Sequence, residues 1–204
     1  MMEKMKLLSI VIFSLVILIS CKKSEYSPAE FVEWVEDKNN GLLQDQDRKE
    51  YRYSFLLKPK EYLVLKSMKA NDLSGDLFLK ALEDYENLNY ASLWIESNNG
   101  QPILKRQAAS DNNELAMYYS FGLQKDLFLL EGNDTLKCVY AHQVQDGGIS
   151  NRLHFLLAFE QSRNKEIKSK TFLYRHSIAN EENILFTFDM QDFSKVPKIQ
   201  FDKL

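Results

Sequence analysis

The residues with the clearest metal-binding chemistry in this sequence are its three histidines. His142, His154 and His176 fall on three different predicted strands, and neutral imidazole is a common zinc ligand. A two-residue turn at 147–148 would place His142 opposite Leu153, with His142 and His154 on opposite faces of the sheet. A three-residue loop would bring these two histidines together, but it would also set the apolar row of one strand on the polar side of the other. We therefore expect structural histidines and no metal site.

Nucleophilic catalysis would require an activated serine or cysteine. The sequence has no glycine-flanked serine at a predicted strand-to-helix turn, which is the usual local signal of such a nucleophile. Cys138 alternates with Leu136 and other apolar residues along a predicted strand, which indicates a buried and unreactive thiol. A phosphate-binding loop is absent as well, because the glycine pair at 147–148 lacks a following lysine. The sequence therefore predicts no catalytic residue and no cofactor.

Carboxylates occur in three close pairs. None of these pairs has the spacing of a calcium loop or of a recognisable glycosidase pair, so solvated loops are the expected setting. The pairs are Asp45 with Asp47, Glu181 with Glu182, and Asp189 with Asp192.

Aromatic side chains are numerous, with 13 Phe, 10 Tyr and 2 Trp. Flat rings can stack on a sugar or a peptide, although most of these rings alternate along the sequence as core positions do. The candidates for an exposed stacking surface are Trp34, Trp94, Tyr118 and Tyr119. Consecutive residues of a strand point to opposite faces, so Tyr118 and Tyr119 are not expected to enter the same layer.

Three short helices are predicted in the first part of the chain. The first begins with a capping box at Ser27–Glu30 and ends before the left-handed exit expected at 39–41. The second follows Pro59 and runs from residue 60 to about 69. The third covers 71–87, where apolar residues form one stripe and charged residues face away from it.

Most of the remaining chain has the period-two pattern of strands, beginning at 51–57. The other predicted strands are 90–96 and 102–107, joined as a hairpin by Asn99-Gly100, then 115–121, 127–130, 136–145, 153–159, 170–176, 184–190 and an edge strand at 199–201. Strands at this spacing indicate antiparallel pairing. The predicted fold class is α+β, with short N-terminal helices packed on an antiparallel β-sheet or β-sandwich.

The composition is that of a folded globular domain. Of the 204 residues, 45% are hydrophobic and 27% charged, and the chain has only 7 Gly and 4 Pro. The formal net charge of −3 provides no basic field for a nucleic-acid backbone, so nucleic acid is not an expected partner. We expect one domain over 28–204, with a helical part at 28–88 and a β-rich part at 89–204.

The first twenty residues have the layout of a signal peptide. Lys4 and Lys6 precede an apolar run at 7–19, and a run of this length is too short to span a bilayer as a helix. The pattern predicts an exported chain from which residues 1–20 are removed.

Leu18-Ile19-Ser20-Cys21 resembles the lipobox of bacterial lipoproteins. The resemblance implies that the Cys21 sulfur receives a diacylglyceryl group, that cleavage follows Ser20, and that the new amino group is acylated. Two or three acyl chains anchor a protein firmly, whereas one does so only marginally. A lipidated Cys21 also leaves Cys138 without a disulfide partner.

The anchor implies an outer-membrane lipoprotein with a short tether at 21–27. Lipoproteins exported to the cell surface in the Bacteroidota carry an acidic cluster directly after the cysteine. Here the tether contains only Glu25 as an acidic residue. We therefore expect the protein to face the periplasm.

The body of the chain resembles Bacteroidota lipoproteins of unknown function. The resemblance lies in 40–42 after the first helix, in Lys58-Pro59 with Tyr62, and in the turn at 132–135. It implies a habitat and no particular activity. Asp134-Thr135-Leu136 also resembles the O-glycosylation signal of exported Bacteroidota proteins, which makes Thr135 a candidate glycosylation site.

These observations favour a lipid-anchored, non-enzymatic binding or accessory module that meets an envelope protein partner at the membrane. The alternatives are a small envelope hydrolase and a glycan-binding protein with a dispersed site. A pocket with two close carboxylates or with a Ser-His pair would favour the enzyme. An exposed strand edge or a large apolar patch would favour the partner.

Overall fold

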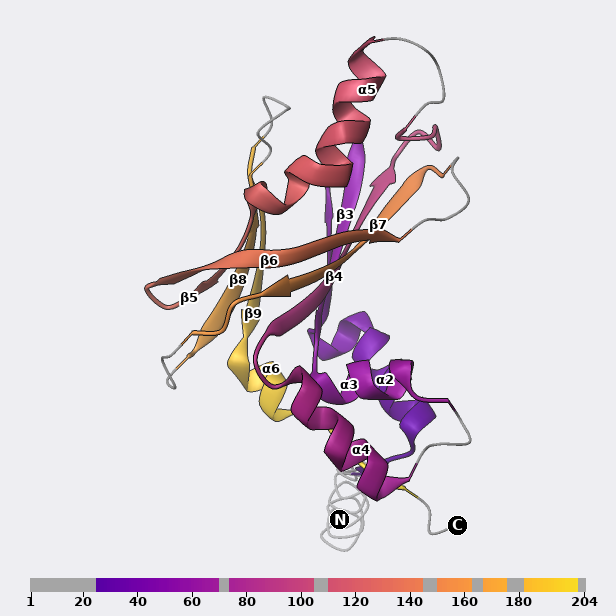
Figure 1. Ribbon diagram of the computed structural model, residues 1–204, viewed down its shortest axis with the longest axis vertical. Coiled ribbons are helices and arrows are strands. Elements are labelled where there is room, and N and C mark those ends of the chain that lie inside the picture. Colours follow the sequence, from indigo (N-terminus) through magenta and orange to yellow (C-terminus); the bar gives the residue numbers. More distant parts are fainter. Residues whose placement is uncertain are drawn as a thin grey trace, which may run out of the picture.

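The computed structural model describes residues 25–69, 74–104, 110–144, 150–162, 167–175 and 182–201, and over these residues short helices accompany an eight-stranded antiparallel sheet (Figure 1). The expected α+β class is thereby confirmed. The strands are β2 (Leu43–Asp47), β3 (Tyr51–Lys58), β4 (Asn89–Ser97), β5 (Leu127–Glu131), β6 (Asp134–Val144), β7 (Arg152–Phe159), β8 (Ser169–Tyr174) and β9 (Ile184–Asp189). Their order across the sheet is β2-β3-β4-β7-β6-β5-β8-β9.

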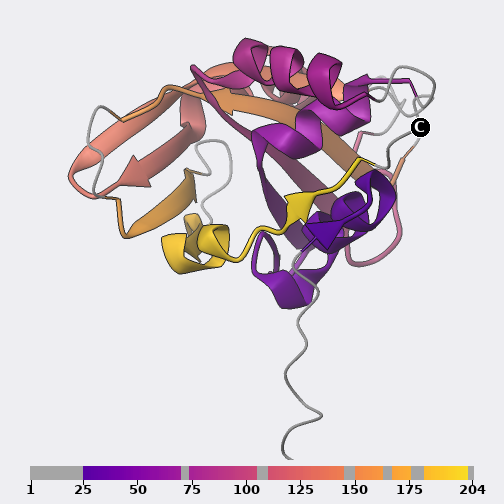
Figure 2. The ribbon, with the colours of Figure 1, turned by 90° about the horizontal axis from the view of Figure 1, so that it is seen from below.

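The sheet curls until it is nearly a barrel. Phe55 on β3 and Phe172 on β8 stack with ring centroids 4.0 Å apart, although these strands stand second and seventh in the sheet order. The two edge strands also meet, because the Gln44 side-chain amide on β2 donates a hydrogen bond to the Thr187 carbonyl on β9 at 2.8 Å. Seen from below, the curved layer has helices around its lower end (Figure 2).

Alternating residues of the strands fill the interior of this curl. On β3 the inward set is Tyr53, Phe55 and Leu57, and all three belong to one large buried cluster with residues of β4 to β9. The strand predictions at 51–57, 127–130, 136–145, 153–159, 170–176 and 184–190 are confirmed where residues are described, because this alternation has period two.

Four helices lie toward the lower end of the sheet in Figure 1. They are α2 (Pro28–Glu36), α3 (Lys60–Ser67), α4 (Gly75–Leu82) and α6 (Met190–Ser194). Helix α2 begins with the predicted capping box between Ser27 and Glu30, and the left-handed exit is at Gly41, with φ of 85°. A second buried cluster unites Phe31 of α2, Tyr62 of α3, Phe78 of α4 and the outward-facing Leu56 of β3.

The strand predicted at 115–121 is wrong. Helix α5 (Ser110–Met117) continues there into a π-helical turn, η5 (Tyr118–Gly122), and then into a 3-10 turn, η6 (Leu123–Asp126). Only 8% of Tyr118 and 4% of Tyr119 is exposed, and both rings join the core of the curled sheet. The expectation that these neighbours enter different layers fails because successive residues of a helical turn, unlike those of a strand, can lie on the same side.

The hairpin predicted around Asn99-Gly100 is also wrong. The turn itself exists, with Gly100 at φ of 70°, but residues 101–104 form no strand. Strand β4 instead pairs with β3 on one side and with β7 on the other. Both neighbours of β4 are therefore long-range partners that a local turn signal does not reveal.

The register expected for the strands that carry His142 and His154 differs from the register in the structure. The turn at 145–149 lies outside the described residues, but beyond it His142 pairs with Leu156 and His154 pairs with Val144. This register places His142 and His154 on the same face of the sheet, so the opposite-face argument is wrong. A β-bulge between Cys138 and Tyr140 shifts the register further along β6. His176 lies outside the described residues.

The end of the expected tether is part of the fold. Glu25 and Tyr26 form β1, which pairs in parallel with β10 (Lys198–Ile199), so the predicted edge strand at 199–201 joins β1 and not the main sheet. Residues 1–24, including the predicted signal peptide and Cys21, lie outside the described residues. No helix among those that the structure describes has the length and apolar character to span a membrane.

Candidate functional site

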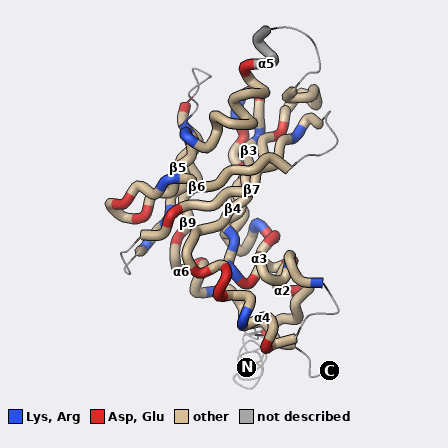
Figure 3. The backbone as a smooth tube through the Cα atoms, viewed as in Figure 1, with Lys and Arg blue, Asp and Glu red and all other residues tan. Residues whose placement is uncertain are grey.

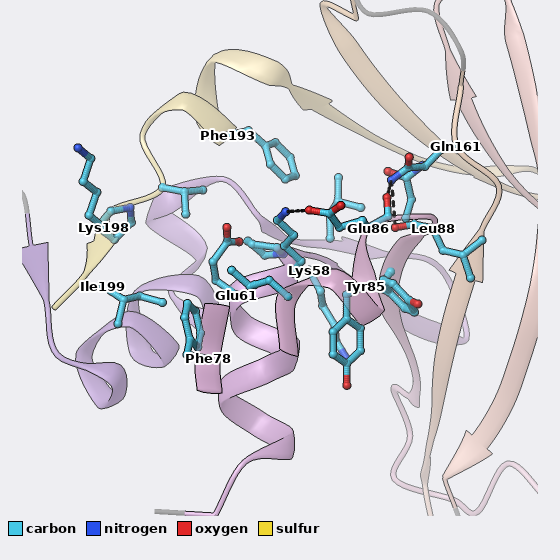
Figure 4. Close-up of a pocket in the computed structure, with 18 of the residues that line it drawn as sticks. Lys58, Glu61, Phe78, Tyr85, Glu86, Leu88, Gln161, Phe193, Lys198 and Ile199 are labelled. Carbon is cyan, nitrogen blue, oxygen red and sulfur yellow. Dashed lines mark hydrogen bonds and ion pairs between the residues drawn. The ribbon is translucent and has the colours of Figure 1, made fainter. Parts of the chain in front are cut away.

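A cavity of about 790 Å³ lies at the lower end of the curled sheet, and we call it the end cavity (Figure 4). Its wall is made where β3 passes into α3, where α4 returns to β4, and where the chain after α6 crosses beneath the sheet. Apolar contacts come mainly from Phe78 and Leu79 of α4 and from Phe193 of α6. This volume lies within the range of ordinary small-molecule and cofactor sites.

A buried ion pair lies where the sheet interior meets the end cavity. Glu131 and Lys170 are cross-strand partners on β5 and β8, and both point into the curl. The Lys170 Nζ lies 2.7 Å from Glu131 Oε1, close enough for an ion pair although not aligned as a hydrogen bond. The same ammonium donates to Asn89 Oδ1 at 2.5 Å. Only 1% of the Glu131 side chain and 12% of the Lys170 side chain is exposed, and Lys170 lines the cavity.

The rim of the end cavity is polar, and an ion pair and a hydrogen bond between rim residues hold part of it in place. Lys60 forms an ion pair with Glu86 at 2.9 Å, and the Gln161 side-chain amide donates to the Glu86 carbonyl at 2.7 Å (Figure 4). These bonds tie the β7–β8 connection and the start of α3 to the segment that precedes β4. The rim is therefore held from three separate parts of the chain.

The lining of the end cavity carries more positive than negative charge. It contains four lysines, Lys58, Lys60, Lys170 and Lys198, and two glutamates, Glu61 and Glu86, whereas the whole chain has a formal net charge of −3. Figure 3 shows basic and acidic positions side by side around α3, α4 and α6. A local positive excess on an acidic protein favours a ligand that carries negative charge.

The predicted stacking residues do not gather into one platform. Tyr118 and Tyr119 are buried in the core, where the Tyr118 hydroxyl donates to Asp126 at 2.6 Å. Trp94 is half-buried on the outer face of β4, where its ring stacks on the His154 ring with centroids 4.8 Å apart and lies 5.3 Å from the Arg152 guanidinium. Trp34 is half-buried on α2 and lines a separate cavity beside β1.

The remaining predicted residues have simple settings. Thr135 is exposed as the second residue of β6, near the two-residue turn that joins β5 to β6. Cys138 is buried as predicted, and burial raises the pKa of its thiol to about 12. Among the residues that the structure describes, no three His, Cys, Asp or Glu side chains are grouped so that they could hold a metal ion.

A Ser-His contact exists that the sequence did not single out. The Ser92 hydroxyl lies 3.1 Å from His154 Nε2, between neighbouring strands β4 and β7. Ser92 has no exposed surface, so a substrate cannot reach its oxygen in this conformation. A nucleophile must contact the atom that it attacks, and this contact is therefore structural.

The inward charge at Glu131 could have been found from the sequence. Leu127, Leu129 and Glu131 are alternate positions of one strand, so the alternation that buries the two leucines also points Glu131 inward. The predicted strand at 127–130 ends one residue before Glu131, which is the last residue of β5.

No known protein family, curated protein or solved structure matches this chain.

Proposed function

We propose that this protein is a lipid-anchored, non-enzymatic binding module of the bacterial cell envelope, and that its end cavity holds an acidic, partly apolar segment of an envelope partner protein. The observation that carries the proposal is the combination of Lys58 and Lys198, which form no ion pair within the described residues, with apolar α4 and α6 side chains around a cavity of about 790 Å³. Acidic groups would meet Lys58 and Lys198, while apolar groups would lie against Phe78 and Phe193.

The proposed anchor places the end cavity near a lipid surface. Lipidation of Cys21 would leave four residue steps to Glu25, and four extended residues reach at most about 14 Å. Glu25 pairs with Lys198, which lines the end cavity. The cavity would then lie close to the periplasmic face of the outer membrane, where an envelope partner is available.

The proposal also assigns a role to the short N-terminal helices. We propose that these helices pack on the antiparallel sheet, and the apolar cluster that joins Phe31, Phe78 and Leu56 supports this packing. We also propose that the β layer is one curled sheet and not a two-layer sandwich, and the contact of Phe55 with Phe172 supports this form. The helices and the end of the sheet together form the walls of the binding site.

The proposal is tested by photocrosslinking in intact cell envelopes. A photoreactive residue replaces Leu79, which is 63% exposed and lines the end cavity, and as a matched control it replaces Leu185, which is 49% exposed on the outer face of β9. We expect a discrete partner to crosslink at position 79 and not at 185, and we expect Cys21→Ala to abolish it. The same products from both positions, or no envelope product at position 79, would contradict the proposal.

A further inference from the structure

A smaller cavity of about 420 Å³ lies on the outer face of the sheet beside α3, and we call it the outer-face pocket. Its lining is dominated by rings and aliphatic side chains, among them Tyr62, Leu63, Tyr90, Tyr140 and Leu156. Lys58 and Tyr90 line both this pocket and the end cavity, so the two sites are neighbours.

The strand register places the lining residues of the outer-face pocket on one face of the sheet. Lys58, Tyr90, Ala158 and Tyr140 are successive partners across β3, β4, β7 and β6, so they share one face and one row. Ala158 separates the two tyrosines in this row. Tyr140 remains 52% exposed, although it lies beside apolar neighbours.

Two ammonium groups lie at the α3 side of this pocket. The Nζ atoms of Lys58 and Lys66 lie 5.8 and 5.4 Å from the centroid of the Tyr62 ring. The acidic group near them is Glu36, which accepts a hydrogen bond from the Tyr62 hydroxyl at 2.6 Å and pairs with Lys66 at 2.9 Å. One carboxylate therefore faces two ammonium groups.

Lys58 is the ammonium group without a counter-ion in direct contact. Within the described part of the chain, no hydrogen bond or ion pair reaches its Nζ, and its side chain is partly buried. Burial, and next the nearby charge of Lys66, lower the pKa of Lys58 to about 8. A buried cation that lacks a partner is unfavourable, and an anion placed beside it would relieve this cost.

We propose that the outer-face pocket binds an amphipathic anion, a molecule with an apolar chain or ring and one carboxylate or phosphate group. The anionic oxygens contact Lys58 and Lys66, and the apolar part lies between Tyr90 and Tyr140 against Leu156. This pocket shares Lys58 and Tyr90 with the end cavity. Its test measures the binding of small anions, whereas the test of the partner site measures crosslinking at Leu79, so either assignment can fail without the other.

The test uses the full chain with phosphatidylcholine nanodiscs and titration calorimetry at pH 7. The probes are 4-phenylbutyrate, 4-phenylbutyl phosphate and the uncharged 4-phenylbutanol, which share one apolar body. We expect both anions to bind at least about tenfold more tightly than the alcohol. Equal affinities for the anions and the alcohol would overturn the proposal.

Four variants locate the binding. Lys58→Met should weaken both anions by about tenfold and leave the alcohol unchanged, and Lys66→Met should weaken them less because Glu36 already neutralises Lys66. Tyr140→Ala should weaken all three probes, because it removes an exposed ring from the apolar wall. Lys80→Met changes an exposed lysine of α4 outside both cavities and serves as the control. Unchanged anion binding by both Lys58→Met and Tyr140→Ala would place the ligand elsewhere.

A repeat in nanodiscs that contain phosphatidylglycerol distinguishes the source of the anion. Weaker probe binding there would show that a lipid headgroup phosphate competes for Lys58, and unchanged binding would assign the pocket to a free amphiphile. Both results require the loss of anion affinity in Lys58→Met.

Discussion

The Glu131 carboxylate and the Lys170 ammonium lie 2.7 Å apart inside the curled sheet, at the point where its apolar filling gives way to the end cavity. The strands β5 and β8 present them as direct partners, and Asn89 of β4 accepts a further hydrogen bond from the lysine. One ammonium thereby links three strands of the sheet. Its positive charge is largely neutralised, which leaves Lys58 and Lys198 as the lysines available to an acidic ligand.

We expect this ion pair to have a large and non-additive effect on the free energy of unfolding. Glu131→Met or Lys170→Met should each lower the free energy of unfolding by about 3–5 kcal/mol, because each leaves an uncompensated buried charge. The double variant should recover most of the loss, since no charge then remains buried. Urea unfolding followed by circular dichroism measures these changes. Asp47→Ala, which breaks an exposed ion pair with Arg52, should cost far less, and a loss comparable to that of Glu131→Met would contradict the argument.

The lowered pKa of Lys58 predicts that the free energy of unfolding depends on pH. Its pKa is about 8 in the folded chain and about 10.5 when unfolded, so between these values the unfolded chain binds more protons and the wild type gains stability as the pH rises. Below pH 8 the buried charge is unfavourable, and Lys58→Met should stabilise the protein there by on the order of 1–2 kcal/mol after solvent screening. The gain should shrink as the pH approaches 10.5. Thermal unfolding at pH 7 and pH 10 measures it, and a gain that is equal at both values would be inconsistent with a charged and buried Lys58.

Cys138 should be nearly inert in the folded protein. Burial raises the pKa of its thiol to about 12, so little thiolate exists at pH 8, and the sulfur donates to the Tyr140 carbonyl. In a Cys21→Ser chain, alkylation by iodoacetamide at pH 8 should be at least about 100-fold slower than in guanidinium chloride. Mass spectrometry follows the reaction. Rapid labelling of the folded chain would indicate that the core around β6 opens readily.

Gly122 is predicted to be a position where no other residue is tolerated without cost. A Cβ atom there would lie 2.8 Å from Cδ2 of Tyr118, a buried ring that is held by its hydrogen bond to Asp126. Gly122→Ala should therefore lower the free energy of unfolding by about 1–3 kcal/mol.

Gly75→Ala is the matched control for this substitution. Gly75 begins α4, and its nearest neighbour to an added Cβ is 3.9 Å away, so alanine should be neutral or stabilise the protein by up to about 1 kcal/mol. Denaturant midpoints compare the two variants. A loss in Gly75→Ala as large as that in Gly122→Ala would remove the steric explanation.

Local patterns were sufficient for most elements and insufficient for their assembly. The capping box at Ser27 and the alternation in 127–130 each depend on neighbouring residues, and the structure confirms both. The alternation of Leu115, Met117, Tyr119 and Phe121 has the same form, yet this segment is helical. In the helical segment Leu115 and Tyr119, four residues apart, face the core, whereas Met117 and Phe121 are 60% and 74% exposed, so the alternation did not mark one buried face.

The candidate sites could not be predicted because they depend on contacts between distant strands. The end cavity exists because the sheet curls until Phe55 meets Phe172, and no local signal encodes that closure. The outer-face pocket depends on a register that brings Ala158 between Tyr90 and Tyr140, and the β-bulge in β6 shifts that register. The inward orientation of Glu131, by contrast, follows from the period-two alternation of side chains along β5 alone.

The parallel pairing of β1 with β10 has a mechanical consequence. Any pull on the chain ahead of Glu25 is transmitted through the backbone hydrogen bonds of this pair to Lys198 and Ile199. These two residues also line the end cavity. Under the proposed function, tension at the Cys21 anchor would therefore act directly on the wall of the end cavity.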